Sequence, residues 1–260
     1  MPKPDAPQPD VPETGGDPSA QMRAQMPVAN PDLARVLLSR LQAAGAHRVL
    51  DLGCGDGAVA AMLTEAGFDV TGIDPAPDPL ARARTRAPRA TFLQRGAEDL
   101  PKGLGPFDAA CFVNSLHHID QARMADALLG ALAALRPGGI ALVIEPLPEG
   151  SFFRAMRPIE DESEVRHAAM RQIERLISDG RIVLRDLLRW KRASHFANLG
   201  QFVDYLTRAD PYRAELAERH APQLARAWRE NIRSCEGKAV LVQPMICWTL
   251  TLPRKKGTRP

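Results

Sequence analysis

The pattern of apolar and polar residues alternates between two periods over the first half of the chain. Short apolar runs typical of buried strands fall at 47–51, 69–73, 91–94, 107–113 and 139–145. Segments with helical spacing lie between them, at 58–66, 78–87 and 120–135. Strands that alternate with helices predict an α/β fold, with a parallel sheet covered on both faces.

The flanking segments extend this core. Leu33, Val36, Leu37 and Leu41 predict an earlier helix, with Asn30-Pro31 at its start. After Glu145 the pattern changes and predicts the following elements: helices at 160–178, 199–208 and 212–234, and strands at 182–191 and 239–252. We therefore expect one domain over 30–252, a flexible proline-rich tail over 1–29 and a basic tail over 253–260.

Composition excludes some classes of protein. The net charge of +3 is too small to require a nucleic acid or membrane partner. No apolar run reaches the about 18 residues of a membrane span, and the first residues lack the apolar core of a secretory signal. The cysteines show no CxxC pair and no metal-site spacing with histidine: Cys54, Cys111, Cys235 and Cys247. We expect a cytoplasmic protein without a metal.

The most informative motif follows the first strand. Residues 49–57 read VLDLGCGDG, which is an apolar strand that ends in an acid and continues into a loop with three glycines. Glycines let the backbone turn sharply and approach a ligand closely, and the helix N-terminus that follows attracts polar or anionic groups. The motif therefore predicts a nucleotide-like ligand at the carboxyl end of the first strand.

Polar groups at the ends of the other strands predict further parts of the same site. Asp74 closes the second strand, where a carboxylate can accept the hydroxyls of a ribose. Glu98 and Asp99 follow the third strand and could accept a hydrogen bond from an adenine amino group. The fourth strand leads into NSLHHI, and the fifth follows RPGG and ends in Glu145.

Together these motifs resemble the class I S-adenosylmethionine-dependent methyltransferases, in particular the group that acts on small molecules. The resemblance covers about residues 45–146 and implies a Rossmann-like, doubly wound, mostly parallel sheet of seven strands, with 239–252 antiparallel beside 182–191. It also implies the residues of the cofactor site: Asp51, Gly53, Cys54 and Gly55 at the methionine portion, Asp74 and Pro75 at the ribose, Ala97 and Glu98 at the adenine edge, and Asn114 at the floor. One position departs from the family, because Gly96 stands where members often have an acid before the alanine.

The histidine pair is the candidate for catalysis. His117 would line the site, and His118 would face the transferred methyl group and act as a base, since imidazole titrates near neutral pH. The alternative is a histidine that only packs or donates a hydrogen bond, because many methyl transfers need alignment and no base.

Other residues allow two interpretations each. Asp74 could instead cap the turn that follows it. Basic residues at odd positions of the strand 181–192 would share one face, for an anionic partner or simply for solvent: Arg181, Arg185, Arg189 and Lys191. Phe152 and Phe153 could form an apolar lid or pack internally.

The resemblance implies S-adenosylmethionine as methyl donor, S-adenosylhomocysteine as product and a small-molecule acceptor, methylated on oxygen in preference to carbon, nitrogen or sulfur. The acceptor side would come from 146–235, and neither nucleic acid nor membrane is expected as a partner. No oligomeric state is predicted. Two alternatives remain open: an RNA or protein methyltransferase of the same fold, and a non-catalytic protein that binds the cofactor.

Overall fold

The computed structural model describes residues 32–208 and 211–253. The predicted N-terminal tail, the Asn30-Pro31 helix start and residues 254–260 of the basic tail lie outside these described residues.

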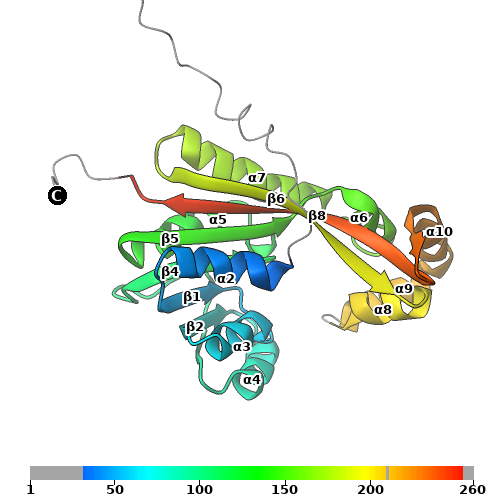
Figure 1. The fold of residues 1–260 in the computed structure, drawn as a ribbon, viewed down its shortest axis with the longest axis horizontal. Coiled ribbons are helices and arrows are strands. Elements are labelled where there is room, and N and C mark those ends of the chain that lie inside the picture. The colour runs from blue at the N-terminus through cyan, green and yellow to red at the C-terminus, as the bar shows by residue number, and fades with distance from the viewer. Residues whose placement is uncertain (1–31, 209–210, 254–260) are drawn as a thin grey trace, which may run out of the picture.

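A central twisted sheet organises the described part of the chain (Figure 1). Its strand order is β3-β2-β1-β4-β5-β8-β6, and the short β7 pairs with β8. The strands are β1 (Arg48–Leu52), β2 (Asp69–Asp74), β3 (Thr91–Gln94), β4 (Phe107–Val113), β5 (Leu135–Pro146), β6 (Val183–Phe196), β7 (Arg233–Cys235) and β8 (Lys238–Thr251). The first five are parallel, and β8 lies antiparallel between β5 and β6. The predicted mostly parallel α/β fold is confirmed, with β7 as a strand beyond the expected seven.

Helices cover both faces of this sheet, as a doubly wound fold requires. The helices that accompany the parallel strands are α2 (Leu33–Ala43), α3 (Ala58–Glu65), α4 (Pro77–Arg86) and α5 (Met124–Ala133), and α7 (Ser163–Ser178) follows β5. The apolar residues of α2 and α3 pack with Val49 and Val70 on one face. Those of α5 and α7 pack with Leu50 and Trp248 on the other.

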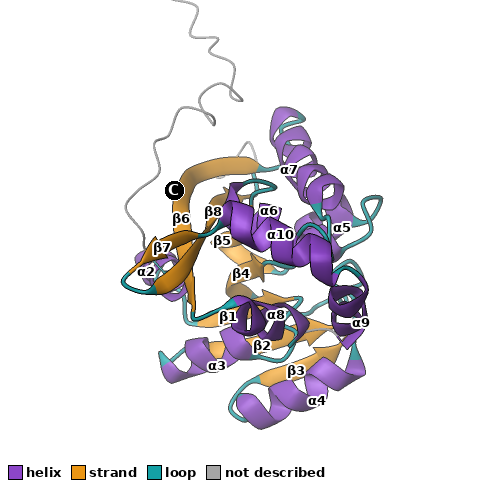
Figure 2. Cartoon of the chain, turned by 90° about the vertical axis from the view of Figure 1, so that its right-hand side faces the viewer, coloured by secondary structure: helices purple, strands orange, loops and turns teal. Residues whose placement is uncertain are grey.

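Beyond the main sheet, β6 and β8 continue as a long ribbon that carries a smaller helical lobe (Figures 1 and 2). The lobe contains α6 (Gly150–Met156), α8 (Leu199–Thr207), α9 (Pro211–Arg219) and α10 (Ala221–Asn231). Its core includes Phe152, Phe196, Phe202 and Trp228, whose rings contact one another. Phe152 and Phe153 are buried here, so they pack internally.

Two local predictions were wrong. The helix predicted over 212–234 is two helices and a strand, because Pro222 lacks an N–H and fits only the first turn of a new helix, α10. The basic residues predicted to share one face of β6 do not all do so: the pairing of β6 with β8 shifts register around Arg185, which separates this residue from Arg189 and Lys191. In the described residues, helix α2 begins after Asp32, whose carboxylate accepts the Arg35 N–H at 2.6 Å.

Candidate functional site

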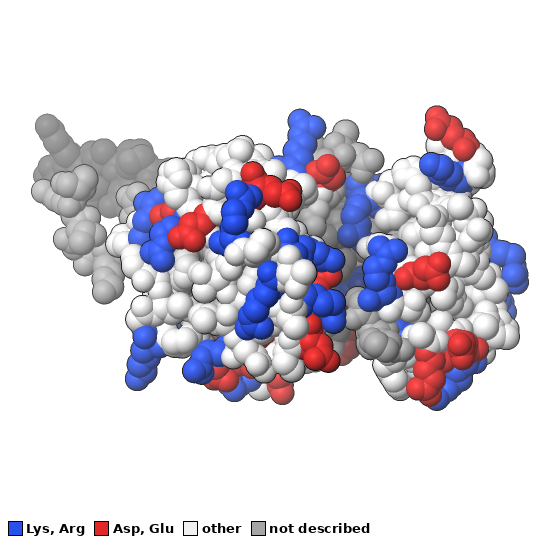
Figure 3. Space-filling model, turned by 90° about the horizontal axis from the view of Figure 1, so that it is seen from below, with Lys and Arg blue, Asp and Glu red and all other residues white. Residues whose placement is uncertain are grey.

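The carboxyl ends of the parallel strands meet at one edge of the sheet, next to the helical lobe (Figure 1). Every predicted cofactor residue is at this edge, in a strand end or in the loop that follows it. In the space-filling view from below, a hollow with Lys and Arg on both sides separates the sheet with its helices from the lobe (Figure 3). Ligands of open α/β sheets bind at such an edge.

Two glycines of the loop after β1 serve different purposes. Gly53 has a φ of +71°, and a Cβ there would lie 2.5 Å from the Ser115 Cβ, so this glycine allows the loop to pack against the segment after β4. Gly55 has a φ of +53°, and a Cβ there would meet nothing within 4 Å. Residue 55 therefore borders open space, where a ligand could approach the backbone.

Asp74 holds this loop in place. Its Oδ2 accepts the Gly55 N–H at 2.9 Å, and its Oδ1 accepts the Ala76 N–H at the same distance. The carboxylate therefore caps the turn after β2 and ties it to the glycine loop. A second lone pair on each oxygen remains for a ribose hydroxyl. Pro75, which follows, is exposed.

Cys54 packs into the fold. Its thiol lies against Gly72 of β2, close enough that a Cβ on that glycine would come within 2.9 Å of Sγ. Burial, together with the charges of Asp51 and Asp74, raises the pKa of the Cys54 thiol well above its usual range. This cysteine stays protonated, and only its backbone borders the loop.

Asp51 is a buried carboxylate with an incomplete set of partners. Only 1% of its surface is exposed. Its Oδ1 accepts a weak hydrogen bond from the Cys111 thiol at 3.7 Å, and its Oδ2 has no partner in the described part of the chain. Burial raises the pKa of Asp51 to about 7, with a smaller contribution from the charge of Asp74. A buried acid without a cation is costly, so this oxygen is suited to a ligand that supplies one.

A second acceptor without a partner comes from Asn114, just after β4. The residue takes a left-handed backbone conformation with a φ of 52°, and its N–H donates to the Ile144 carbonyl at 2.8 Å. Its Oδ1 is buried without a hydrogen bond from any described residue. Asp51 and Asn114 thus leave two oxygen acceptors for the donors of a ligand, which fits the ammonium end of S-adenosylmethionine.

The two acids predicted near the adenine differ in their contacts. Asp99 is exposed and pairs with Arg123 at 2.9 Å. The Glu98 carboxylate turns back over Gly96, where a Cβ would lie 2.6 Å from its Oε1. Glu98 therefore occupies the space into which an acid at position 96 would project, beside the buried Ala97. Its carboxylate can thus stand in for the acid that Gly96 lacks.

Glu145 organises the loop that carries the histidines, a role that the sequence did not predict. Its Oε1 accepts the N–H groups of Ser115 at 3.2 Å and Leu116 at 2.8 Å. Its Oε2 lies within hydrogen-bonding distance of His117 Nδ1. The acid at the end of β5 thus holds the short 3-10 helix η1 (Leu116–His118) at the edge of the site.

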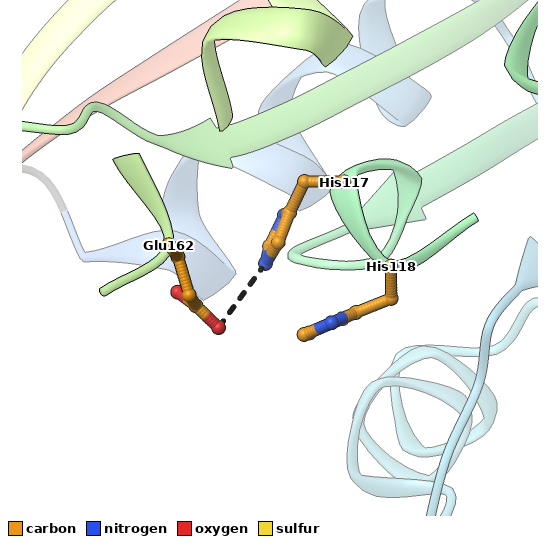
Figure 4. Close-up of side chains that lie close together, drawn as sticks. All are labelled: His117, His118 and Glu162. Carbon is orange, nitrogen blue, oxygen red and sulfur yellow. Dashed lines mark ion pairs between the residues drawn. The ribbon is translucent and has the colours of Figure 1, made fainter. Parts of the chain in front are cut away.

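The two histidines differ in environment (Figure 4). His117 is buried, and although burial lowers its pKa, the charge and hydrogen bond of Glu145 and the charge of Glu162 outweigh this and raise it. His118 is exposed, with its ring centroid 4.1 Å from that of His117. Partial loss of hydration and then the charge of His117 lower the pKa of His118. At neutral pH, His118 is therefore the unprotonated member and could accept a proton.

Two residues at the start of α7, an acid and an arginine, complete the surroundings of His117. Glu162 Oε1 lies 3.8 Å from His117 Nε2. Its Oε2 accepts from Arg166 Nε at 2.9 Å, and Arg166 Nη1 also donates to the Leu147 carbonyl at 3.2 Å. Burial would raise the pKa of Glu162, but the charges of Arg166 and His117 lower it. Neither residue belongs to a motif that could have been recognised in the sequence.

Comparison with known proteins shows which family part of the chain resembles. Residues 49–139 match the model of the methyltransferase domain. An uncharacterized methyltransferase of Synechocystis sp. is 37% identical over 108 residues, which make up 42% of this chain and 51% of that protein. Two further relatives match over similar lengths and carry names for different reactions. The malonyl-[acyl-carrier protein] O-methyltransferase of Enterobacter lignolyticus is 29% identical over 54% of this chain and 55% of its own. The rat glycine N-methyltransferase is 35% identical over 41% of this chain and 43% of its own.

The crystal structure of the YcgJ protein of Bacillus subtilis shares the fold more widely. It superposes with a TM-score of 0.60 over 85% of this chain and 98% of its own, at 17% sequence identity. The chain spans about half the length of the curated relatives it matches. These findings show that residues 49–139 resemble a methyltransferase domain and that the chain shares its fold with YcgJ.

Proposed function

We propose that the protein transfers a methyl group from S-adenosylmethionine to an oxygen atom of a small-molecule acceptor. The observation that carries the proposal is the pair of buried oxygens without partners among the described residues, on Asp51 and Asn114, beside the open space at Gly55. A buried polar atom without a partner is rare in folded proteins and is satisfied when a matching ligand binds.

Different residues at the sheet edge bind different parts of the cofactor. Asp51 and Asn114 hold the ammonium group, Gly53 and Gly55 border the methionine portion, Asp74 accepts the ribose hydroxyls and Glu98 accepts from the adenine edge beside Ala97. When bound, the sulfonium group supplies an activated methyl group and leaves as a neutral thioether. His118 takes the proton of the acceptor hydroxyl at its imidazole nitrogen as the new C–O bond forms.

The surface favours a small acceptor over a nucleic acid. Lys and Arg are interspersed with Asp and Glu over the face drawn in Figure 3, and the net charge is only +3. A protein that binds nucleic acid usually presents a continuous basic surface to the phosphates. In the described part of the chain, no helix is long and apolar enough to cross a bilayer. We place the protein in the cytoplasm, where its four free cysteines stay reduced.

Calorimetric titration with S-adenosylhomocysteine tests the cofactor half of the proposal. We expect binding at a single site by the wild-type protein. Absence of binding would exclude both the methyltransferase and the non-catalytic cofactor-binding protein.

The Asp51→Asn variant should be more stable than the wild type but should bind the cofactor more weakly. The pKa of Asp51 in the folded protein, about 7, lies above the usual 3.8. This residue therefore does not destabilise the fold below about pH 4, and the destabilisation grows with pH until it is complete above pH 7. We expect the variant to be more stable than the wild type by about 1–3 kcal/mol at pH 8, after allowing for an unpaired amide. Cofactor affinity should fall about 100-fold, because the ammonium loses its counter-ion.

The pH dependence of cofactor affinity tests whether the charge of Asp51 is responsible. Wild-type affinity should weaken about tenfold for each pH unit below 7, as Asp51 becomes protonated, and the Asp51→Asn protein should lack that dependence. Thermal melting and titrations at pH 6, 7 and 8 measure both effects. A variant that binds as well as the wild type at pH 8 would remove Asp51 from the site.

Asp74→Ala should weaken S-adenosylhomocysteine binding about 10- to 100-fold, or about 1.5–3 kcal/mol, because the ribose loses its acceptor. Because the Asp74 carboxylate also accepts the Gly55 N–H, part of the loss in affinity could result from a change in the conformation of the glycine loop. A ligand without the two ribose hydroxyls separates the causes in a double-mutant cycle, because only a direct contact makes the two losses non-additive. Asp69→Ala, at the other end of β2, is the matched control. Additive losses would mean that Asp74 only caps the turn after β2 and does not contact the ribose.

A further inference from the structure

We propose that His117, His118 and Glu162 bind a divalent transition-metal ion of the zinc type (Figure 4). One nitrogen from each histidine and one carboxylate oxygen all lie within 4.8 Å of one another. Two imidazoles and a carboxylate are a donor set that zinc accepts, with a fourth position left open for a further ligand.

The orientation of His117 supports this assignment. With Nδ1 at Glu145, Nε2 is the ring nitrogen that a metal ion can take in place of a proton, and it faces Glu162 Oε1 at 3.8 Å. A histidine that binds a metal through one ring nitrogen typically donates the other N–H to a carboxylate, which fixes the tautomer and strengthens the ligand. Glu145 is in that position.

Glu162 has one oxygen available for the ion. Arg166 occupies Oε2, whereas Oε1 lies 3.8 Å from both His117 Nε2 and Arg213 Nη2, too far for a hydrogen bond to either. Two ligands about 2.1 Å from a tetrahedral zinc ion are about 3.4 Å apart. The observed separation is thus close to that of a metal-bound pair, and small side-chain movements would close the remainder.

The charges around the cluster leave room for a cation. Three carboxylates and two guanidinium groups lie in and around the cluster: Glu145 at His117, Glu162 paired with Arg166, and Glu160 paired with Arg213. Arg213 also pairs with Glu160, so it is not committed to Glu162 alone. With both histidines neutral, this set carries one net negative charge, which a bound cation or a proton on His117 would offset.

The cluster is open to solvent on one side. His117 and Glu162 are buried, but His118 is exposed, so an ion can enter and a fourth ligand can reach it. Such a site has the form of a catalytic metal site with an open position. Resting on the proposed function, the fourth ligand would be the acceptor hydroxyl, whose pKa the ion lowers. His118 then holds the ion, and the proton of the acceptor hydroxyl passes to solvent on the open side of the cluster. In the metal-free protein, His118 takes that proton itself.

Metal binding can be measured without any acceptor. The full chain is stripped with a chelator and titrated with Zn²⁺ against a chromogenic competitor, and with Co²⁺ by its visible absorption. We expect one equivalent to bind with micromolar or tighter affinity, with the intense absorption of tetrahedral Co²⁺. Glu162→Gln and His118→Ala should each weaken binding at least about tenfold. His167→Asn, an exposed histidine of α7, is the matched control and should bind as the wild type does.

Two results would overturn the inference: no stoichiometric binding by the wild type, or equal affinity in the wild type and in the His118→Ala protein. The second result is informative even if Glu162→Gln fails to fold, because His118 is exposed and its removal leaves the Arg166 pair intact. The cofactor proposal stands or falls separately. Binding of S-adenosylhomocysteine without metal binding would contradict only the metal site, and metal binding without S-adenosylhomocysteine binding only the proposed function.

Discussion

Replacing Gly55 with valine should abolish binding of S-adenosylmethionine and S-adenosylhomocysteine, with a loss of at least about 100-fold in affinity. The glycine N–H is tied to Asp74, so the backbone is fixed, and the space in front of its Cα is empty within 4 Å. A branched side chain would occupy the volume that the methionine portion needs. Calorimetry measures the loss, and circular dichroism verifies the fold.

Gly45→Val supplies the matched control. Gly45 has nearly the same φ, +59°, and a Cβ there also meets nothing within 4 Å, but it lies between α2 and β1, away from the carboxyl edge. Both substitutions therefore carry the same backbone strain, about 1–2 kcal/mol. Only Gly55→Val should lose the cofactor. Equal cofactor binding by both variants would mean that the loop after β1 is only a turn and does not contact the ligand.

His118→Ala should lower turnover about 100-fold or more while cofactor affinity stays within about twofold. Because its pKa is lowered, His118 is unprotonated at pH 7, and the wild-type rate should be constant above neutrality and fall below the lowered pKa. The variant should lose that acidic limb.

Steady-state rates between pH 5 and 8, in chelator-treated protein with and without added Zn²⁺, measure the effect. His167→Asn should keep both the rate and the pH profile of the wild type. If the His118→Ala protein turns over as fast as the wild type, alignment of donor and acceptor is sufficient for transfer.

The core of the fold and the cofactor edge were predictable because their signals are local. The strand before Gly53, the acid closing β2 and the alternation of strands with helices each lie within a few residues. For the same reason, Asp51 could be predicted as a residue of the cofactor site. Its burial beside Cys111 of β4, its oxygen without a hydrogen bond from the described residues and its raised pKa follow from tertiary contacts and could not be predicted.

The surroundings of the histidines could not be predicted in the same way. Glu162 and Arg166 stand in a polar helical segment without a motif, and only the packing of α7 against η1 brings them to His117. The expectation of a protein without a metal rests on cysteine spacing, and that criterion does not consider a cluster of two adjacent histidines and a distant glutamate, such as the one proposed above to bind an ion. The strand end at Glu145 carried a signal, an acid after an apolar run, whose partners are set by tertiary contacts.

The acceptor side was the least predictable part of the chain. The segment 146–235, proposed to form this side, contains the helices of the lobe, α7, β6 and β7, and it has no sequence motif that names a substrate. Residues 1–31 lie outside the described residues, so the expected flexibility of the N-terminal tail stays a prediction.

Methyl transfer from labelled S-adenosylmethionine into a fractionated cell extract tests the central claim most directly. We predict that the wild-type protein places label in a low-molecular-weight fraction and releases S-adenosylhomocysteine in equal amount, and that the Gly55→Val protein does neither. Label in RNA or protein would contradict the small-molecule acceptor. Cofactor binding without any transfer across all fractions would contradict the assignment as an enzyme.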